Sequence, residues 1–277
     1  MTRFERPESM AEATSLLAAG DWALLAGGTD LYPAHVGRPI ARPLLDLSRV
    51  AGLRGIVKGD DGWSIGATTT WTDVIRADLP PLFDALKAAA REVGGVQIQN
   101  AGTVAGNVCN ASPAADGMPV LLALGAEVDL RSGLGSRRLP LDAFVLGSRR
   151  TARRGDELMT ALHIPARSAR ARSVFAKLGG RRYLVISIAM VAVVVDVDEA
   201  GRVVSAGVAV GSCSAVAKRL PSLEARLCGR PVADLAAGVE PDDLVILTPI
   251  NDIRASADFR LDATVTLLRR ALASLAP

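Results

Sequence analysis

The spacing of apolar side chains predicts one helix and short strands in the first part of the chain. Residues 9–12 (Ser-Met-Ala-Glu) fit a capping box, and Gly20 is well placed to end the helix that follows. The apolar runs at 22–26 and 44–47 have the length of short buried strands. We therefore expect a small N-terminal unit that combines a helix with strands.

The middle of the chain, about residues 53–165, mixes short strands with two predicted helices. Apolar side chains recur at helical spacing over 82–93. Ser112-Pro113 predicts the start of the second helix, because serine is a good N-cap and proline a good first residue. Gly125 is expected to end this helix, and a strand is expected at 126–131.

A change in amino-acid composition and apolar pattern after residue 165 predicts a second domain. Residues 166–173 have the composition of a linker, and the strand-like runs 184–198 and 202–211 flank a hairpin turn. Apolar side chains form one stripe over 261–275, so the last helix is expected to pack against another element. The second domain is therefore predicted to be an antiparallel sheet with helices.

Charge and composition exclude some classes of protein. The 277 residues carry a net charge of +3 and only 4% aromatic side chains, so the dense basic stripe and stacking aromatics of a nucleic-acid surface are missing. No apolar run reaches the ~18 residues of a membrane span. The three cysteines are far apart and the N-terminus has no apolar signal core, which together predict a cytoplasmic location.

The first candidate binding motif is a glycine pair at the end of the first strand. It runs from Leu24 to Leu31 (Leu-Leu-Ala-Gly-Gly-Thr-Asp-Leu), and Pro33 predicts a helix start nearby. Paired glycines let the backbone turn tightly and bring amide groups close to a phosphate, and a helix N-terminus would add partial positive charge. Because such turns are common, this motif alone favours a plain strand-to-helix turn.

The second candidate motif, residues 102–116, is longer and almost free of bulky or charged side chains. Side-chain hydrogen bonds are available from Thr103, Asn107, Asn110 and Ser112. Asp116 is expected either to accept hydrogen bonds from sugar or ribityl hydroxyls or to complement a helix dipole. A run of this composition would pack poorly as an ordinary core loop, so it favours a ligand site.

Neither motif follows the Rossmann or P-loop glycine pattern. The two histidines, His35 and His163, have no zinc-like spacing to the cysteines, and three scattered cysteines cannot supply the four thiolates of an iron–sulfur cluster. The sequence also shows no hydrolase nucleophile motif. We therefore predict no catalytic residue and no metal ligand in this chain, so a cofactor must supply any chemistry.

The two motifs resemble those of the medium, FAD-binding subunits of the xanthine dehydrogenase and carbon monoxide dehydrogenase family of molybdenum hydroxylases. The resemblance is carried by 24–31, 97–107, 112–116, 175–177 and 252–260. It covers nearly the whole chain in the expected order, and the second motif is its most specific part. Relatives often have two glycines before the asparagine of this motif. Here the first is Ala105, whose backbone is expected to avoid a glycine-only conformation.

The resemblance implies an α+β fold. An FAD-binding domain of the vanillyl-alcohol-oxidase (PCMH) type is expected at 1–165, with subdomains at about 1–52 and 53–165, followed by a CO dehydrogenase flavoprotein C-terminal-like domain at 166–277. FAD is expected between the two N-terminal subdomains. The implied cofactor-binding residues are Leu24, Leu25, Ala26, Gly27, Gly28, Thr29, Asp30, Leu31, Gly102, Thr103, Val104, Ala105, Gly106, Asn107, Asn110, Asp116, Met159, Lys177 and Tyr183.

The resemblance also implies a flavoprotein oxidoreductase subunit that relays electrons within a heterotrimer, itself expected to dimerise. The implied partners are a large subunit with a molybdenum cofactor and a small subunit with [2Fe–2S] clusters, and the terminal acceptor would be NAD, oxygen, a quinone or another molecule. Two alternatives stay open. One is a self-contained FAD-dependent reductase of the same fold, for which no convincing substrate site or proton donor is found; the other is a non-catalytic nucleotide-binding module.

Overall fold

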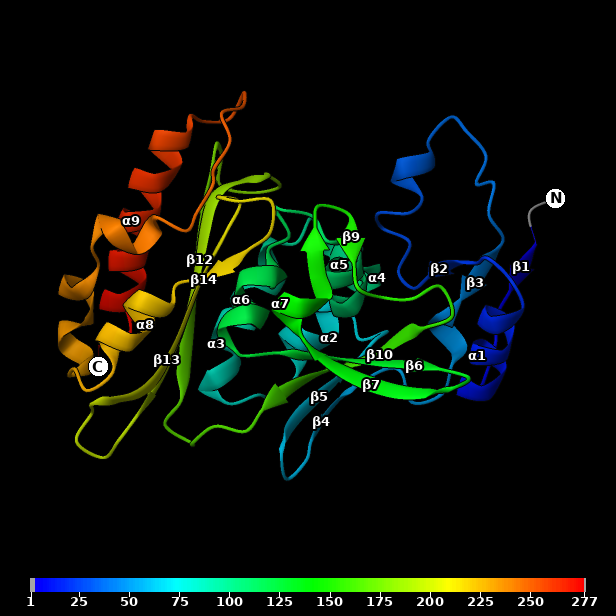
Figure 1. Cartoon of the computed structure of the whole chain (residues 1–277), viewed down its shortest axis with the longest axis horizontal. Helices are drawn as coiled ribbons and strands as arrows, with labels where there is room; N and C mark the ends of the chain where they lie inside the picture. Colours follow the sequence, from blue (N-terminus) through cyan, green and yellow to red (C-terminus); the bar gives the residue numbers. More distant parts are fainter. Residues whose placement is uncertain (1–2, 277) are drawn as a thin grey trace.

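The computed structural model describes residues 3–276. Its N-terminal unit is a three-stranded parallel sheet in the order β1 (Phe4–Glu5), β3 (Leu44–Asp46) and β2 (Ala23–Leu25), accompanied by α1 (Met10–Ala19) (Figure 1). The hydroxyl of Ser9 accepts a hydrogen bond from the amide of Glu12 at 3.2 Å and caps α1, and Gly20 follows its last turn. The predicted first helix is confirmed as α1, and the strands predicted at 22–26 and 44–47 are confirmed as β2 and β3.

Residues 26–43 form an arch that leads from β2 to β3 and projects away from the sheets (Figure 1). The prediction of a helix near Pro33 is wrong, because only one 3-10 turn (η1, Pro33–His35) forms there. Gly37 follows with a φ of +75°, a left-handed conformation that cannot continue a right-handed helix. The first motif therefore lies in a turn and receives no helix dipole.

The second unit is a five-stranded antiparallel sheet with short helices packed around it. The strand order is β4 (Ile56–Lys58), β5 (Gly62–Gly66), β10 (Leu158–Pro165), β6 (Glu127–Ser132) and β7 (Gly135–Pro140). A 3-10 turn, η2 (Leu47–Arg49), follows β3 in the N-terminal unit. The remaining elements of the second unit are α2 (Trp71–Arg76), η3 (Pro81–Phe83), α3 (Asp84–Glu92), α4 (Val96–Ala101), α5 (Val104–Asn110), α6 (Gly117–Ala123), α7 (Leu141–Phe144), β8 (Val145–Gly147) and β9 (Arg150–Thr151). The helix predicted from the spacing over 82–93 and the strand predicted at 126–131 are confirmed as α3 and β6.

About half of the second motif folds as helix rather than as a loop. The helix α5 covers Val104–Asn110 within the motif, and α4 directly precedes the motif; neither helix was predicted from the sequence. The helix predicted to start at 112–113 begins only at Gly117. The amide of Ser212 donates to the carbonyl of Pro113 at 3.1 Å, which ties this segment to the C-terminal part of the chain and keeps it out of the helix.

A four-stranded antiparallel sheet forms the C-terminal part, in the order β11 (Arg172–Gly179), β12 (Ser187–Val197), β13 (Val203–Gly211) and β14 (Lys218–Arg219). The predicted hairpin turn between β12 and β13 is confirmed, because the amide of Asp198 donates to the carbonyl of Arg202 at 2.9 Å. The predicted strand start at Leu184 is wrong. This residue is 59% exposed and has a left-handed φ of 51°, so β12 begins at Ser187.

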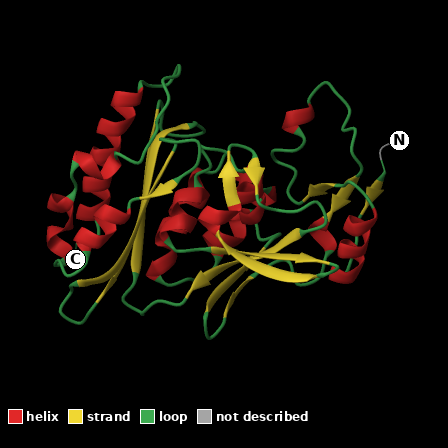
Figure 2. Ribbon diagram, viewed as in Figure 1, coloured by secondary structure: helices red, strands yellow, loops and turns green. Residues whose placement is uncertain are grey.

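The C-terminal sheet is covered on both faces (Figure 2). On one face, Ala192 and Val194 of β12 join the core that also contains residues of α3 and α6. On the other face, Val191, Val193 and Val195 join a second core. That core is completed by α8 (Pro221–Leu227), η4 (Val232–Gly238), η5 (Pro241–Leu244) and α9 (Ala257–Ala273). Because β12 is buried along its whole length, the sheet connects the two parts of the molecule.

Residues 252–260, one of the segments that carry the family resemblance, hold the start of α9 against this sheet. Arg260 is 2% exposed and donates to the carbonyl oxygens of Ile188 and Ser212 and, at 2.8 Å, to the carboxylate of Asp252. The backbone hydrogen bond from Arg254 is the main cause that lowers the pKa of Asp252 to about 2. Within residues 3–276 no helix has the length and apolar character needed to cross a membrane.

Candidate functional site

The fold brings the two glycine motifs into direct contact. A Cβ atom added at Gly27 would lie 1.9 Å from the carbonyl oxygen of Ala101, so no larger residue fits at this position without displacing one of the segments. The hydroxyl of Thr29 lies 3.2 Å from the place that a Cβ atom on Gly102 would take. Glycine is therefore required at Gly27 for a close approach of two backbones that are far apart in the sequence.

The backbone of the first motif offers free hydrogen-bond donors. Across the described residues, the amide groups of 27–31 donate no hydrogen bond to any other part of the chain. Gly28 has a left-handed φ of 70°, which turns the backbone sharply at this point. Successive amides around such a turn form a concave arrangement that binds anions. The first motif can thus hold a phosphate without the helix that the sequence predicted.

Residues 69–71, which were not among the predicted site residues, hold the second motif in place. The amide of Trp71 donates to the carbonyl of Gly102 at 3.1 Å, and the amide of Val104 donates to the carbonyl of Thr69 at 3.0 Å. Trp71 is 1% exposed and forms part of the first core. The sequence carries one signal for this segment, the capping box of Thr70 and Asp73 that begins α2.

Thr103 and Gly106 shape the first turn of α5. The hydroxyl of Thr103 accepts from the amide of Gly106 at 3.0 Å, and a Cβ atom at Gly106 would lie 2.7 Å from that oxygen. Ala105 is 3% exposed and is absent from the residues with positive φ, so the expectation for its backbone is confirmed. The side-chain oxygen of Asn107 is buried and has no hydrogen-bond partner among the described residues. A buried acceptor of this kind fits a hydroxyl donor from a bound ligand.

Three non-glycine residues with left-handed backbone conformations lie in or near the second half of the second motif. Ala111, Arg149 and Ser212 have left-handed φ values of 47°, 58° and 64°. The amide of Arg149 donates to the carbonyl of Ala111 at 3.0 Å, and its guanidinium donates to the side-chain oxygen of Asn110. Such conformations cost free energy and concentrate at functional sites. Their position supports a site here on grounds independent of the glycine pattern.

Asp116 forms a buried ion pair with the C-terminal sheet. The ammonium group of Lys177 in β11 lies 2.9 and 3.1 Å from the two carboxylate oxygens, and the hydroxyl of Ser187 in β12 donates to one of them at 3.0 Å. Burial raises the pKa of Asp116, and nearby Glu92 adds to this effect, whereas Lys177 and Ser187 oppose it. The structure therefore brings two of the predicted site residues, Asp116 and Lys177, into contact.

The other predicted residues lie in contrasting surroundings. Met159 is 3% exposed in β10, beside a register shift that precedes Ala161. Tyr183 is 66% exposed, and the guanidinium of Arg182 lies 5.3 Å from the centre of its ring. Leu184 reaches to within 3.7 Å of the Cβ position of Gly95, so this loop lies against the start of α4. The role of Tyr183 at the site therefore stays a prediction.

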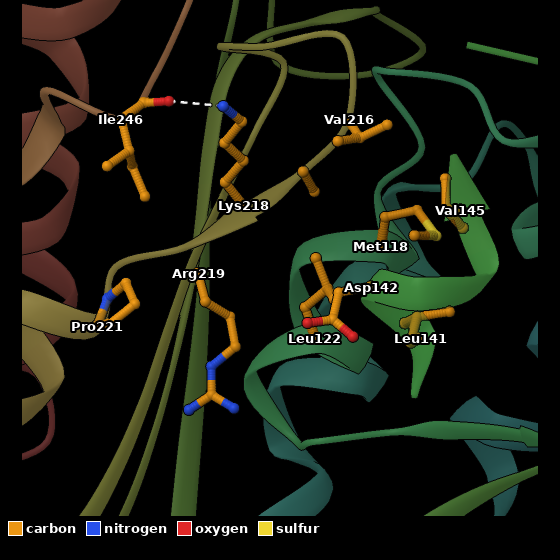
Figure 3. Close-up of a pocket in the computed structure, with 11 residues that line it drawn as sticks. Met118, Leu122, Leu141, Asp142, Val145, Val216, Lys218, Arg219, Pro221 and Ile246 are labelled. Carbon is orange, nitrogen blue, oxygen red and sulfur yellow. Dashed lines mark hydrogen bonds between the residues drawn. The ribbon is translucent and has the colours of Figure 1, made fainter. Parts of the chain in front are cut away.

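Two cavities lie away from the motifs. The first, of about 300 Å³, is lined by residues of α6, α7 and the segment around β14, with the ammonium of Lys218 donating to the carbonyl of Ile246 at 2.7 Å (Figure 3). The second, of about 530 Å³, lies beside β6 and β7. Neither is lined by a residue of the two motifs. Neither cavity therefore belongs to the candidate site formed by the two motifs.

Comparison with known protein families decides between the candidate interpretations. Residues 1–167 match the model of the FAD-binding domain in molybdopterin dehydrogenase, and residues 175–275 match that of the CO dehydrogenase flavoprotein C-terminal domain. The chain belongs to the FAD-binding medium subunits of the molybdenum hydroxylases. These subunits belong to oxidoreductases, and the family resemblance seen in the sequence is confirmed.

Curated relatives of this medium subunit act in different dehydrogenases. The carbon monoxide dehydrogenase medium chain of Hydrogenophaga pseudoflava is 31% identical, over 98% of this chain and 96% of its own. The nicotinate dehydrogenase FAD-subunit of Eubacterium barkeri is 32% identical, over 83% and 80%. The xanthine dehydrogenase FAD-binding subunit of Escherichia coli is 36% identical, but the match spans only 58% of this chain and 57% of that protein.

Solved structures of the family share the complete architecture of this medium subunit. A carbon monoxide dehydrogenase from Hydrogenophaga pseudoflava that lacks the Mo-pyranopterin moiety of its cofactor aligns with a TM-score of 0.84 at 29% identity, covering 98% of this chain and 96% of that one. A cyanide-inactivated Cu,Mo-CO dehydrogenase aligns with a TM-score of 0.88 at 27% identity, covering 99% and 98%. The predicted α+β fold class is confirmed.

FAD is the cofactor of this family's N-terminal domain, and the residues present fit it. The free amides of 27–31 suit a pyrophosphate, and the unpaired oxygen of Asn107 suits a hydroxyl of the cofactor. Among residues 3–276 there is no group of three or more His, Cys, Asp or Glu side chains placed to hold a metal ion.

Proposed function

We propose that this medium subunit holds FAD between its two N-terminal units and relays electrons from the [2Fe–2S] clusters of a small partner subunit to a terminal acceptor. A large partner subunit would carry the molybdenum cofactor that oxidises the substrate. The observation that carries the proposal is the contact between the two motifs at Gly27 and Ala101, which forms a glycine-lined cradle with free amide donors. Bound FAD supplies one- and two-electron transfer.

Different residues of the chain would contact different parts of FAD. Residues 26–30 and 103–107 would wrap the pyrophosphate, and Asp116 would accept hydrogen bonds from cofactor hydroxyls. Lys177, Met159 and Tyr183 would lie nearer the flavin, with Leu24, Leu25, Leu31, Val104 and Asn110 shaping the walls of the two motifs. Because the pyrophosphate would be held mainly by backbone groups of the motifs, binding would depend strongly on the fixed geometry of these segments.

The proposed assembly is a cytoplasmic dimer of heterotrimers. Support comes from relatives named as medium chains or medium subunits of dehydrogenases and hydroxylases, which implies larger and smaller companions. The cysteines Cys109, Cys213 and Cys228 are all free thiols, as expected in a reducing compartment. The proposed domain division, 1–165 and 166–277, places the Asp116–Lys177 ion pair across the boundary between the domains.

Affinity purification of the tagged full chain from its native cells, followed by absorbance, FAD and metal analysis, tests this function. The expected product is a yellow-brown complex with FAD, iron, molybdenum and two companion chains. A yellow single chain without metals would overturn the relay and favour a self-contained reductase. A colourless chain would overturn FAD binding itself and favour a non-catalytic nucleotide-binding module.

A further inference from the structure

The hydroxyl of Ser187 occupies a specific place in the polar cluster around Asp116. Ser187 is the first residue of β12 and is 2% exposed. Its hydroxyl donates to Oδ1 of Asp116 at 3.0 Å, while Lys177 contacts both Oδ1 at 2.9 Å and Oδ2 at 3.1 Å. All three side chains are nearly or fully buried, so no exposed group competes strongly for these contacts.

The Asp116 carboxylate keeps acceptor sites that neither Lys177 nor Ser187 fills. An ionised carboxylate has about two lone-pair sites on each oxygen. Lys177 donates to Oδ2 and Ser187 donates to Oδ1, so each oxygen has one of its two sites filled. One acceptor site is left on each oxygen. The serine and the lysine together fix the orientation of the carboxylate and leave it able to accept another hydrogen bond.

We propose that Ser187 is a positioning residue, which orients the Asp116 carboxylate so that a free acceptor site on it receives a hydrogen bond from a hydroxyl of bound FAD. This inference rests on the proposed function and adds to it a contribution from the C-terminal sheet. The second motif would then be complete only when β12 is docked against it. Ser187 touches Asp116 and not the cofactor, so its effect would pass through the carboxylate.

The proposal predicts an effect on the pH range of FAD binding. The charged groups that act on Asp116 are Lys177 from β11 and Glu92 from α3, and the Ser187 hydrogen bond acts from β12. Burial raises the pKa of Asp116, and the Ser187 hydrogen bond opposes that rise. Without the hydroxyl the pKa rises further, so the ionised acceptor is lost at a higher pH as the solution is acidified.

Flavin-fluorescence titration of the full chain with FAD at several pH values tests the proposal. Ser187→Ala is expected to weaken binding roughly tenfold at neutral pH, since hydrogen bonds to charged groups are worth more than neutral ones. The acid midpoint of FAD release is expected to move up by about one pH unit. Thermal unfolding of the same samples reports whether the variant is folded.

Ser173→Ala is the matched control. Ser173 is 6% exposed on neighbouring β11, and its hydroxyl accepts from the amide of Ala85 and donates to the carbonyl of Leu82, away from Asp116. It should lower the melting temperature while keeping wild-type FAD affinity and pH midpoint. Equal affinity and midpoint in both variants would overturn the role of Ser187 and leave FAD binding intact. A wild-type chain that binds no FAD would overturn both proposals.

Discussion

At the scale of single residues, Lys177 has the clearest energetic role. Its ammonium group neutralises Asp116 where both side chains are nearly buried, with exposed fractions of 7% and 11%. Removing one partner of such a pair leaves an uncompensated buried charge, which is strongly destabilising. The basic residue expected near the flavin therefore also stabilises the contact between the second motif and the C-terminal sheet.

Lys177→Met is expected to lower the free energy of unfolding by about 3 kcal/mol at neutral pH. Loss of Lys177 removes the main influence that opposes the raised pKa of Asp116, so the folded variant takes up a proton more readily than the unfolded chain. The difference in the free energy of unfolding between wild type and variant should therefore shrink as the pH falls and Asp116 is protonated. Urea unfolding at neutral and acid pH measures this, with the exposed Lys58→Met as control. A deficit that does not change with pH would contradict the ion-pair account.

At the scale of elements, β13 and α6 approach each other unusually closely. A Cβ atom at Gly207 would lie 2.1 Å from the carbonyl oxygen of Ala123. Gly207→Ala should push the sheet away from α6 and lower the free energy of unfolding by about 1–3 kcal/mol. Urea unfolding checks this against Gly155→Ala, where a Cβ atom would meet nothing within 4 Å. Equal stability of the two variants would show that the sheet and α6 are not tightly packed there.

Elements with a regular apolar pattern could be predicted from the sequence, and elements held by tertiary contacts could not. The spacing over 82–93 and 261–275 located α3 and α9, because each buries one face. The short helix α4 buries no residue, and α5 buries only Val104, Ala105 and Val108 and is anchored by hydrogen bonding to residues 69–71. The serine–proline start signal at 112–113 failed because Ser212 binds that segment from outside the helix.

At the scale of the whole molecule, the site depends on the meeting of distant segments. The sequence identified both glycine motifs, but periodicity alone could not show that Gly27 lies against Ala101 or that Asp116 pairs with Lys177. The role of Ser187 also follows only from the three-dimensional structure. The β11–β14 sheet, buried on both sides, fixes the C-terminal residues relative to the second motif and so extends the site across the molecule.

The most direct test of FAD binding at the two motifs is the FAD affinity of the full chain and of Gly27→Ala. The added methyl would collide with the carbonyl of Ala101, whereas Gly133→Ala adds the same methyl in open space. We predict that Gly27→Ala binds FAD roughly ten- to a hundredfold more weakly than wild type and that Gly133→Ala binds it equally well. Unchanged affinity in a folded Gly27→Ala variant would contradict the account.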